Sequence, residues 1–542
     1  LGLQQLDLFI TRILNTLFHQ SDKLPKDKLH LLLNYDPKHA MTPIHHSNRA
    51  LSRIVLLGSK GYYMVQLKRF GLPVPPGFIV TTEVFRYREI VEGYPPAENN
   101  FREQLSRQLS VLERECGKRL GDPANSLLVS VRSGSIISQP GMMDTFLDVG
   151  LNEEIAAGIA GKSGNEWFAW DNYRRFMQCY GMSFGLKRDD FDAIMNDFKN
   201  RLGVAYKRGL SGPEMKKMAL TYKQRVQDEG IEVLSDPFEQ LSLIIKKVLD
   251  SWESNKAKTY RKIMGISDDW GTAVTVQNMV FGNLSQLSGT GVVFTHNPRW
   301  SGETLKLWGD FTLGNQGEDV VSGLVNTLPI TTTQKDIERR ETDITLETHF
   351  PEIYSTMKSW ATELIYHRGW SPQEMEFTFE SPAPKDLHLL QSRDMGMRER
   401  KKVLTFSPDE MGNRELLGHG IGVSGGAMSG RVVFSLEEID DWRNEEPGTS
   451  LILVRGDTVP DDIREIFSAD GLLTARGGMT SHAAVVAHRI GKTCVVGCKD
   501  LFCNESEKNF LFNEILIRSG DHISIDGRGG SVYKGQVKVK ET

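Results

Sequence analysis

The residues of Gly477-Gly478-Met479-Thr480-Ser481-His482 have types and a spacing that could carry out phosphate chemistry. A glycine pair permits backbone angles that other residues resist, so it predicts a tight turn between a strand and a helix. Thr480 or Ser481 can cap that helix, which places the imidazole of His482 in its first turn. Backbone N–H groups there stabilise an anion, and an imidazole with a pKa of about 6.5 is neutral enough to attack phosphorus. The alternative is a helix start in which His482 only completes the cap.

Two basic residues upstream could meet the phosphates of a donor molecule. Lys60 stands in Gly58-Ser59-Lys60-Gly61, which predicts a flexible turn before a helix, and it could act there as a point charge. This is not a Walker loop, because the Walker spacing is absent. Arg132 leaves an apolar run at residues 127–131, and its guanidinium fork suits phosphate oxygens. A surface turn and a salt-bridge arginine are the alternatives.

A pair of predicted strands carries acidic and amide side chains on one face. Glu374 and Glu376 alternate along the first strand, and Gln391 and Arg393 alternate in the same way along the second. Oxygen atoms of Glu376 and Gln391 are suitable ligands for Mg²⁺ held partly by substrate phosphates. Arg393 would neutralise charge on a transferring phosphoryl group. The alternative is an exposed charged face of a sheet.

Residues 474–487 resemble the phosphohistidine signature of the phosphoenolpyruvate-utilising enzymes, and within that family they are most similar to the pyruvate, phosphate dikinases. The flank at residues 494–498 is similar as well. Upstream, the resemblance extends to the family's ATP-grasp nucleotide-binding domain, and in total it covers about residues 52–393 and 418–536. Ser59 replaces a glycine of the family pattern, and Glu374 replaces an aspartate.

The resemblance implies a role for each candidate residue. His482 would carry the phosphoryl group, with Thr480, Arg132 and Arg393 beside the reacting atoms. Glu376 and Gln391 would hold Mg²⁺. ATP would be bound by Lys60, Arg132, Gly141, Met142, Met143, Thr145, Gln277, Val280, Glu374 and Arg393. Gly141 to Thr145 would form a loop over the phosphates, and the strand around Gln277 and Val280 would edge the adenine.

The chain divides into four predicted segments. Residues 1–50 form a helical lead segment, and residues 51–393 form an α+β nucleotide-binding domain with a helical insertion at about 153–265. Residues 394–417 form a linker that could reach roughly 80 Å when fully extended. Residues 418–542 form an α/β phosphohistidine domain, which the resemblance implies can swivel. We expect the (β/α)₈ barrel of the family to be missing, so that the chain is a fragment or a two-domain form.

Composition narrows the class of protein further. The net charge of −5 and 39% hydrophobic content give no sign of nucleic-acid or membrane partners. Five cysteines without paired spacing predict free thiols in a reducing, cytoplasmic setting.

By the resemblance, ATP would pyrophosphorylate His482 and release AMP. Inorganic phosphate would then accept the terminal phosphoryl group and leave as pyrophosphate. Pyruvate would become phosphoenolpyruvate only through a barrel domain supplied separately. The alternatives are a two-domain kinase with another small-molecule or protein acceptor, and a non-catalytic nucleotide-binding regulator. A homodimer is an assembly left open.

Overall fold

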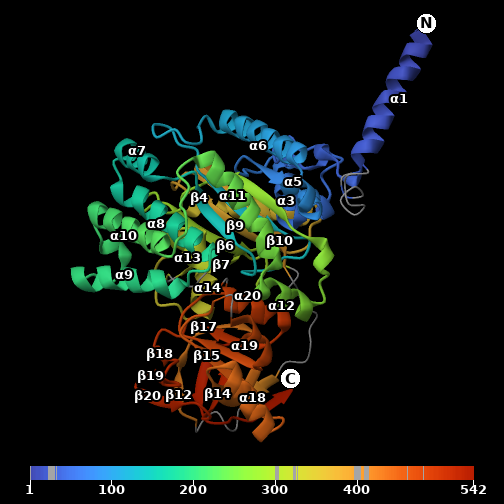
Figure 1. Ribbon diagram of the computed structural model, residues 1–542. Coiled ribbons are helices and arrows are strands. Elements are labelled where there is room, and N and C mark those ends of the chain that lie inside the picture. The colour runs from blue at the N-terminus through green and yellow to red at the C-terminus, as the bar shows by residue number, and fades with distance from the viewer. Residues whose placement is uncertain are drawn as a thin grey trace.

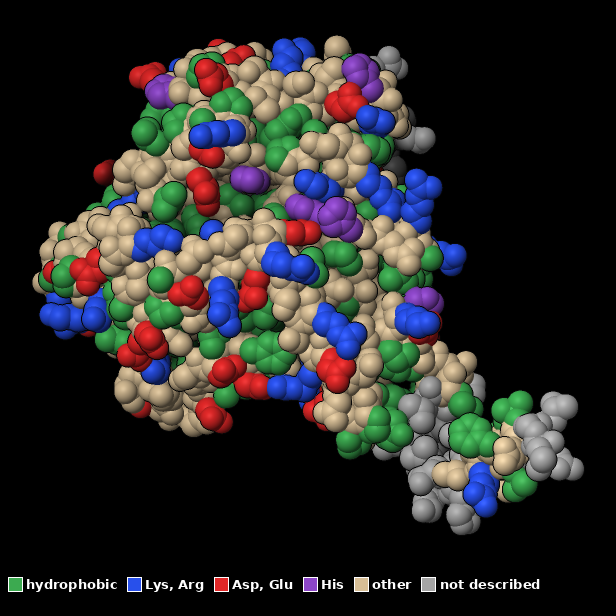
Figure 2. Space-filling view, turned by 90° about the horizontal axis from the view of Figure 1, so that it is seen from above, with side chains coloured by type: hydrophobic (Ala, Val, Ile, Leu, Met, Phe, Trp, Pro, Cys, Tyr) green, Lys and Arg blue, Asp and Glu red, His purple; other side chains and the backbone are tan. Residues whose placement is uncertain are grey.

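The computed structural model describes residues 2–21, 31, 33–298, 304–321, 325, 327–395, 404–407, 414–459, 462–479 and 481–541 of the chain. Figure 1 shows an N-terminal part in blue to yellow and a C-terminal part in orange to red. The predicted lead helix is confirmed as α1 (Gly2–Ser21), which extends away from the rest of the molecule. It carries exposed apolar side chains such as Leu6 and Phe9, and Figure 2 shows hydrophobic side chains on this projection.

Two antiparallel sheets of five strands each form the framework of the N-terminal part. The first has the order β1 (Met41–Pro43), β2 (Gly77–Val80), β5 (Ala273–Asn278), β3 (Val129–Gly134) and β4 (Thr145–Val149). The second has the order β10 (Leu387–Asp394), β9 (Gln373–Phe379), β6 (Gly289–Phe294), β7 (Trp308–Leu313) and β8 (Leu328–Pro329).

Strand β1 differs from the sequence analysis, which placed its residues in the lead segment. Met41 pairs with Val80 of β2, so this short run extends the first sheet at its edge. An edge strand tolerates Pro43, because no neighbour on its outer side requires a backbone N–H. The polar stretch around the strand concealed it from the sequence pattern.

Helices of 4 to 22 residues connect the strands of this part. They are α3 (Ile54–Arg69), α4 (Thr82–Arg86), α5 (Arg88–Gly93), α6 (Pro95–Cys116), α13 (Gly317–Val321), α14 (Thr332–Ile337), α15 (Leu346–His349) and α16 (Pro351–Thr362), with short turns at Pro37–His39, Glu363–His367 and Pro384–Asp386. Helix α6 shows why they form: Phe101, Leu105, Leu109 and Leu112 recur at three- and four-residue spacing and are all buried.

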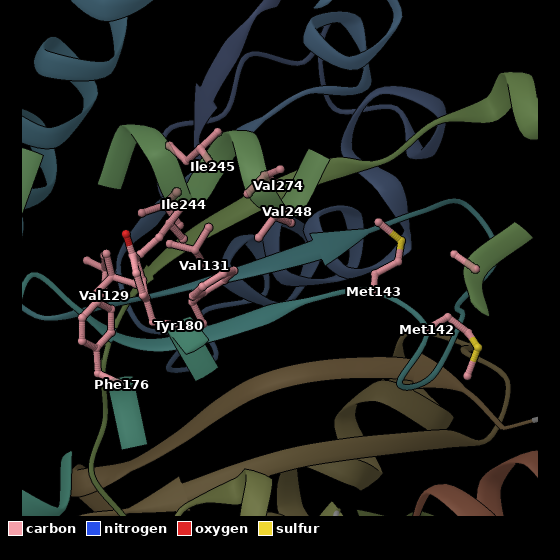
Figure 3. Close-up of a cluster of buried hydrophobic side chains, with 14 of the residues drawn as sticks. Val129, Val131, Met142, Met143, Phe176, Tyr180, Ile244, Ile245, Val248 and Val274 are labelled. Atoms are coloured by element: carbon pink, nitrogen blue, oxygen red, sulfur yellow. The ribbon is translucent and has the colours of Figure 1, made fainter. Parts of the chain in front are cut away.

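The predicted helical insertion is confirmed between β4 and β5. It contains α7 (Glu153–Ser163), α8 (Glu166–Ser183), α9 (Arg188–Leu202), α10 (Gly212–Asp228), α11 (Pro237–Asp250) and α12 (Asn255–Met264), with short turns at Lys207–Gly209, Ser251–Glu253 and Asp268–Trp270. Ser211 and Glu214 form a capping box that starts α10. Phe176 and Tyr180 of α8 pack in one hydrophobic cluster with Val129 and Val131 of β3, so the insertion shares a core with the first sheet (Figure 3).

The C-terminal part is built on an eight-stranded sheet, which confirms the predicted α/β domain. The strand order is β12 (Leu416–His419), β22 (Ser531–Lys534), β21 (His522–Asp526), β14 (Ala427–Val433), β15 (Leu451–Arg455), β16 (Gly471–Thr474), β17 (Thr493–Val496) and β13 (Ile421–Ser424). Strands β14 to β17 are parallel and are connected by α18 (Leu436–Glu445), α19 (Ile463–Ser468) and α20 (His482–Ile490). A small antiparallel sheet of β18 (Leu501–Asn504), β19 (Asn509–Phe512) and β20 (Ile515–Arg518) is attached.

Part of the predicted linker belongs to this C-terminal part. Strand β11 (Leu404–Phe406) pairs with β23 (Val539–Glu541), and β12 begins at Leu416, inside the range predicted as linker. The basic run at residues 398–402 lies outside the described residues. All five cysteines are free thiols, as predicted. Within the described ranges, no helix combines the length and apolarity that a bilayer crossing requires.

Helix α3 is kinked at Gly58, where the sequence analysis predicted a turn before a helix. Gly58 has φ +65°, and the chain is helical on both sides of it, with Leu57 directly before the kink buried in the core. A Cβ atom on Gly58 would lie 1.9 Å from the carbonyl oxygen of Gly134. The backbone N–H and hydroxyl of Ser59 both donate to the carbonyl of Ser135, at 3.0 and 2.9 Å. The kink therefore joins α3 closely to the end of β3.

Replacing Gly58 with alanine should destabilise the fold by more than about 3 kcal/mol, because the new Cβ meets backbone at a strained φ. Gly71→Ala is the matched control, since Gly71 has φ +80° with nothing within 4 Å of an added Cβ, and it should cost only about 1 kcal/mol. Urea unfolding measures both. Equal losses in the two variants would show that the close approach to Gly134 is not needed.

Candidate active site

A large open cleft lies between the two sheets, the helical insertion and the C-terminal part. Most of the candidate residues line it, namely Lys60, Arg132, Gly141, Met143, Thr145, Gln277, Val280, Glu374, Glu376, Gln391 and Arg393. Met142 is instead fully buried in the hydrophobic cluster of Figure 3. Its predicted contact with nucleotide would have to be made by its backbone.

Lys60 lies just after the kink of α3 and faces other cations across the cleft. Burial, followed by repulsion from Arg132, lowers the pKa of Lys60 to about 8, while Glu376 opposes part of this shift. An ammonium group in these surroundings lacks full charge compensation from the protein. An anionic ligand would supply it.

The predicted face of acidic and amide side chains is confirmed by the register of β9 and β10. Gln391 is the cross-strand partner of Glu376, and Arg393 is the partner of Glu374. Arg393 donates a hydrogen bond to Glu374. Burial disfavours the charge on Arg393, but Glu374 and Glu376 outweigh this effect and raise its pKa. The guanidinium is therefore held permanently charged inside the cleft.

Arg132 connects the two sheets at the floor of the cleft. Its guanidinium donates to Gln277 Oε1 at 2.7 Å and to the carbonyl of Leu390 at 3.1 Å, and it lies 3.4 Å from Glu376. Its Nε atom is buried without a hydrogen-bond partner in the described structure. A buried donor left unpaired is costly, so a further acceptor such as a phosphate oxygen fits this position.

The donor set at the strand pair fits a magnesium ion. Glu376 supplies a carboxylate and Gln391 an amide oxygen, both at the cleft. Within the ranges that the structure describes, no group of three or more His, Cys, Asp or Glu side chains could hold a metal. An ion here would therefore take its remaining ligands from phosphate and water, as Mg²⁺ commonly does.

Gln277 and Val280 were predicted to edge the base of a nucleotide. The structure gives Gln277 a further task, because its amide donates to the carbonyl of Pro75 at 3.1 Å while its oxygen accepts from Arg132. Val280 lies just beyond the end of β5 and lines the cleft. Gln277 therefore supports the floor of the cleft, and Val280 stays the better candidate for contact with a base.

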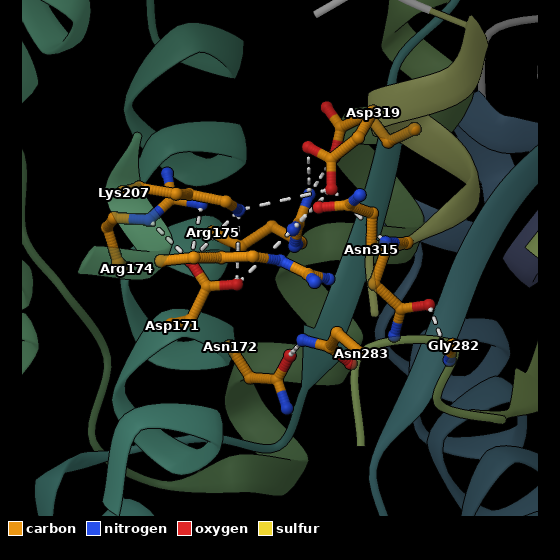
Figure 4. Close-up of polar contacts among 12 residues, drawn as sticks. Asp171, Asn172, Arg174, Arg175, Lys207, Gly282, Asn283, Asn315 and Asp319 are labelled. Carbon is orange, nitrogen blue, oxygen red and sulfur yellow. Dashed lines mark hydrogen bonds and ion pairs between the residues drawn. The ribbon is translucent and has the colours of Figure 1, made fainter. Parts of the chain in front are cut away.

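A largely buried ion network at the wall of the cleft was not assigned by the sequence analysis (Figure 4). Arg175 donates to Asp319 at 2.9 Å, and Lys207 lies 3.3 Å from Asp171. Burial alone would raise the pKa of Asp171, but Lys207 and the neighbouring arginines outweigh it and lower that pKa far below its usual value. Arg174 forms a buried ion pair with Asp171 at 2.9 Å. The network fixes α13 and the insertion against each other.

The predicted strand–turn–helix is confirmed around His482. Strand β16 ends at Thr474, Gly477 has φ +105°, and α20 begins at His482. Ser481 is the N-cap, and its side chain accepts from the N–H of Ala484. Thr480 and the side chain of His482 lie outside the described residues, so their roles stay predictions. Gly477 and Val485, on either side of this helix start, line the cleft that contains Lys60.

A buried carboxylate attaches this turn to the N-terminal part. Asp310 of β7 accepts a hydrogen bond from the backbone N–H of Met479 at 3.0 Å. The same carboxylate accepts from Arg340 at 2.7 Å and from the hydroxyl of Thr327 at 3.0 Å. The start of α20 is therefore docked at the cleft by a directed hydrogen bond.

Comparison with known proteins gives the same two regions. Residues 97–350 match the family described as "Pyruvate phosphate dikinase, AMP/ATP-binding domain", and residues 448–530 match "PEP-utilising enzyme, mobile domain". Pyruvate, phosphate dikinase of Clostridium symbiosum is 36% identical over 520 residues, which is 90% of this chain and 57% of that protein. The chloroplastic pyruvate, phosphate dikinase 1 of Arabidopsis thaliana is 37% identical over 89% of this chain and 51% of its own length.

Both parts of the chain are therefore similar to domains of the pyruvate, phosphate dikinases. The chain spans about half the length of the curated relatives it matches. Of the three cationic residues of the cleft, Arg132 lies within the region matched to the AMP/ATP-binding domain, and α20 lies within the region matched to the mobile domain.

The pKa of Lys60 predicts a pH dependence of ATP affinity. Only the ammonium form attracts phosphate, so affinity should fall by up to about tenfold for each pH unit above 8 in the wild type. Lys60→Arg should remove this decline, because arginine stays charged throughout. Calorimetric titration with ATP between pH 7.5 and 9 measures it. A wild-type decline that persists in Lys60→Arg would argue against this assignment.

Removing the carboxylate of Asp310 should release α20 from the cleft. Asp310→Ala leaves Arg340 with one buried partner fewer, so we expect the free energy of unfolding to fall by about 3 kcal/mol. Because the hydrogen bond to Met479 is also lost, we expect a larger radius of gyration by small-angle X-ray scattering. Asp343→Ala is the control, because Asp343 is fully exposed in its pair with Lys335 and should change neither quantity. An unchanged radius of gyration in Asp310→Ala would contradict the docking role.

Proposed function

We propose that the chain is an ATP-dependent, dikinase-type phosphotransferase in which His482 receives phosphate from ATP. The observation that carries the proposal is the docking of α20 at the same cleft that holds Lys60, Arg132 and Arg393. This arrangement brings the positive end of a capped helix to a site with three cations, which suits the transfer of a polyanion. In this proposal the two antiparallel sheets form an ATP-grasp nucleotide site, and the domain that carries α20 swivels.

The chemistry follows from those positions. An imidazole nitrogen of His482 attacks the β-phosphorus of ATP, the bond from that phosphorus to the bridging oxygen of the α-phosphate breaks, and AMP leaves. Arg132 and Arg393 hold phosphate oxygens and stabilise charge in the transition state, and Lys60 neutralises the chain of phosphates. Glu376 and Gln391 would hold Mg²⁺, which when bound supplies further charge neutralisation.

Inorganic phosphate is the proposed second acceptor. One of its oxygens attacks the terminal phosphorus on the histidine, pyrophosphate leaves, and a single phosphoryl group stays on His482. Onward transfer to pyruvate would give phosphoenolpyruvate if a barrel domain is supplied. Adding pyruvate with a separately supplied barrel protein tests that acceptor.

ATP labelled separately at the β- and γ-positions tests the histidine step. We expect acid-labile label from both positions on the protein, release of AMP, and loss of the γ-label when inorganic phosphate is added. His482→Ala should lose labelling and AMP release together. His488→Ala is the matched control, because it removes the other histidine of α20 at the far end of the helix. Formation of ADP in place of AMP would exclude the dikinase reaction.

A further inference from the structure

Arg489 lies in the last turn of α20 and reaches back into the N-terminal part. Its guanidinium donates to the backbone carbonyl of Ser138 at 2.6 Å and to the hydroxyl of Tyr260 at 3.4 Å. Tyr260 is a buried residue of α12, so it gives the arginine a fixed surface to contact. The helix that begins at His482 therefore touches the nucleotide-binding region at both of its ends.

Ser138 belongs to the loop of residues 135–144 between β3 and β4, directly before the residues that were predicted to cover the phosphates. Its hydroxyl accepts a hydrogen bond from Arg393 at 3.3 Å. The same residue thus contacts Arg393 through its side chain and Arg489 through its carbonyl. The far end of this loop is attached separately, because the N–H of Asp144 donates to Ser251 at 3.2 Å. Gly141, with φ +69°, gives the loop its turn between the two attachments.

We propose that Arg489 is a positioning residue that couples closure of this loop to docking of the histidine helix. The inference rests on the proposed function for its consequence in catalysis. When phosphates occupy the cleft, Arg393 orders the loop and presents the carbonyl of Ser138 to Arg489. When the nucleotide leaves, the loop loses that order and Arg489 loses its acceptor. By linkage, docking of α20 strengthens nucleotide binding by the same factor.

The coupling has a clear mechanical benefit for a histidine that must visit two sites. If α20 docks firmly only when the loop is closed, it docks at a cleft that holds nucleotide and is released from a cleft that has lost it. Asp310 cannot provide this selectivity, because its hydrogen bonds are made with Met479, Arg340 and Thr327, and none of these residues belongs to loop 135–144. Asp310 therefore determines the position at which α20 docks, and Arg489 makes docking depend on nucleotide in the cleft.

Hydrogen exchange with a non-reacting nucleotide tests the coupling without turnover. The probe is α,β-methylene-ATP with Mg²⁺, in which a carbon bridge replaces the oxygen of the bond that would break. In the wild type we expect the nucleotide to slow exchange in both loop 135–144 and α20. In Arg489→Ala the loop should still be protected at saturating nucleotide, while the protection of α20 and the nucleotide affinity fall together, each by up to about tenfold. Arg489→Lys should restore part of that protection.

Two further variants keep the test decisive. Ser138→Ala deletes the contact to Arg393 but keeps the carbonyl, so nucleotide should no longer order the loop and α20 should keep only its nucleotide-free protection. Arg464→Ala removes an exposed arginine of the same domain and should behave as wild type. The rate of His482 labelling from ATP should fall about tenfold in Arg489→Ala, and combining it with Ser138→Ala should add little.

Each result has a distinct meaning. Full nucleotide-dependent protection of α20 in both Arg489→Ala and Ser138→Ala would overturn the coupling. Additive effects of the two substitutions on α20 protection would overturn it as well. Coupled protection in a wild-type protein that never becomes labelled would support the coupling while refuting the proposed histidine chemistry.

Discussion

Positive charge confined in a cleft is the constraint on which the rest of the structure depends. Lys60, Arg132 and Arg393 come from three different elements, and burial opposes the charge on each of them. Glu374 and Glu376 compensate only part of that charge. The kink at Gly58 and the pairing of β9 with β10 hold these groups together against their mutual repulsion. The framework is therefore rigid where the cations meet, and it favours an anion of high charge as their common partner.

The two parts of the chain meet through a small set of directed contacts. Two hydrogen bonds hold α20, each between a charged side chain and a backbone group: the N–H of Met479 donates to Asp310, and Arg489 donates to the carbonyl of Ser138. A salt bridge between Arg188 and Asp457, at 3.1 Å, adds a contact from the helical insertion. Contacts of this kind are directional and modest in energy, so they can specify a docked position without making it permanent.

The sequence predicted the local features well where a motif forces a single geometry. The alternation of Glu374, Glu376, Gln391 and Arg393 gave the correct shared face, because side-chain parity in a strand leaves no choice. Contacts between distant segments were not predictable. Nothing in the pattern around Met142 shows that its side chain turns into the core, or that Gln277 would be used to hold Arg132. The buried network of Asp171 and Asp319 was missed because partners far apart in sequence resemble surface charges.

The pairing of β11 with β23 sets the length of the tether between the two parts. From the sequence alone, the predicted linker of residues 394–417 could reach roughly 80 Å. With β11 built into the C-terminal part, only the chain between Met395 and Leu404 is left to span the gap, a contour of about 30 Å. A domain attached by so short a linker can rotate about a nearby hinge but cannot move far from the N-terminal part. In the proposed swivelling motion, a longer excursion would first require β11 to separate from β23, so this two-stranded ribbon would limit the distance that His482 could move.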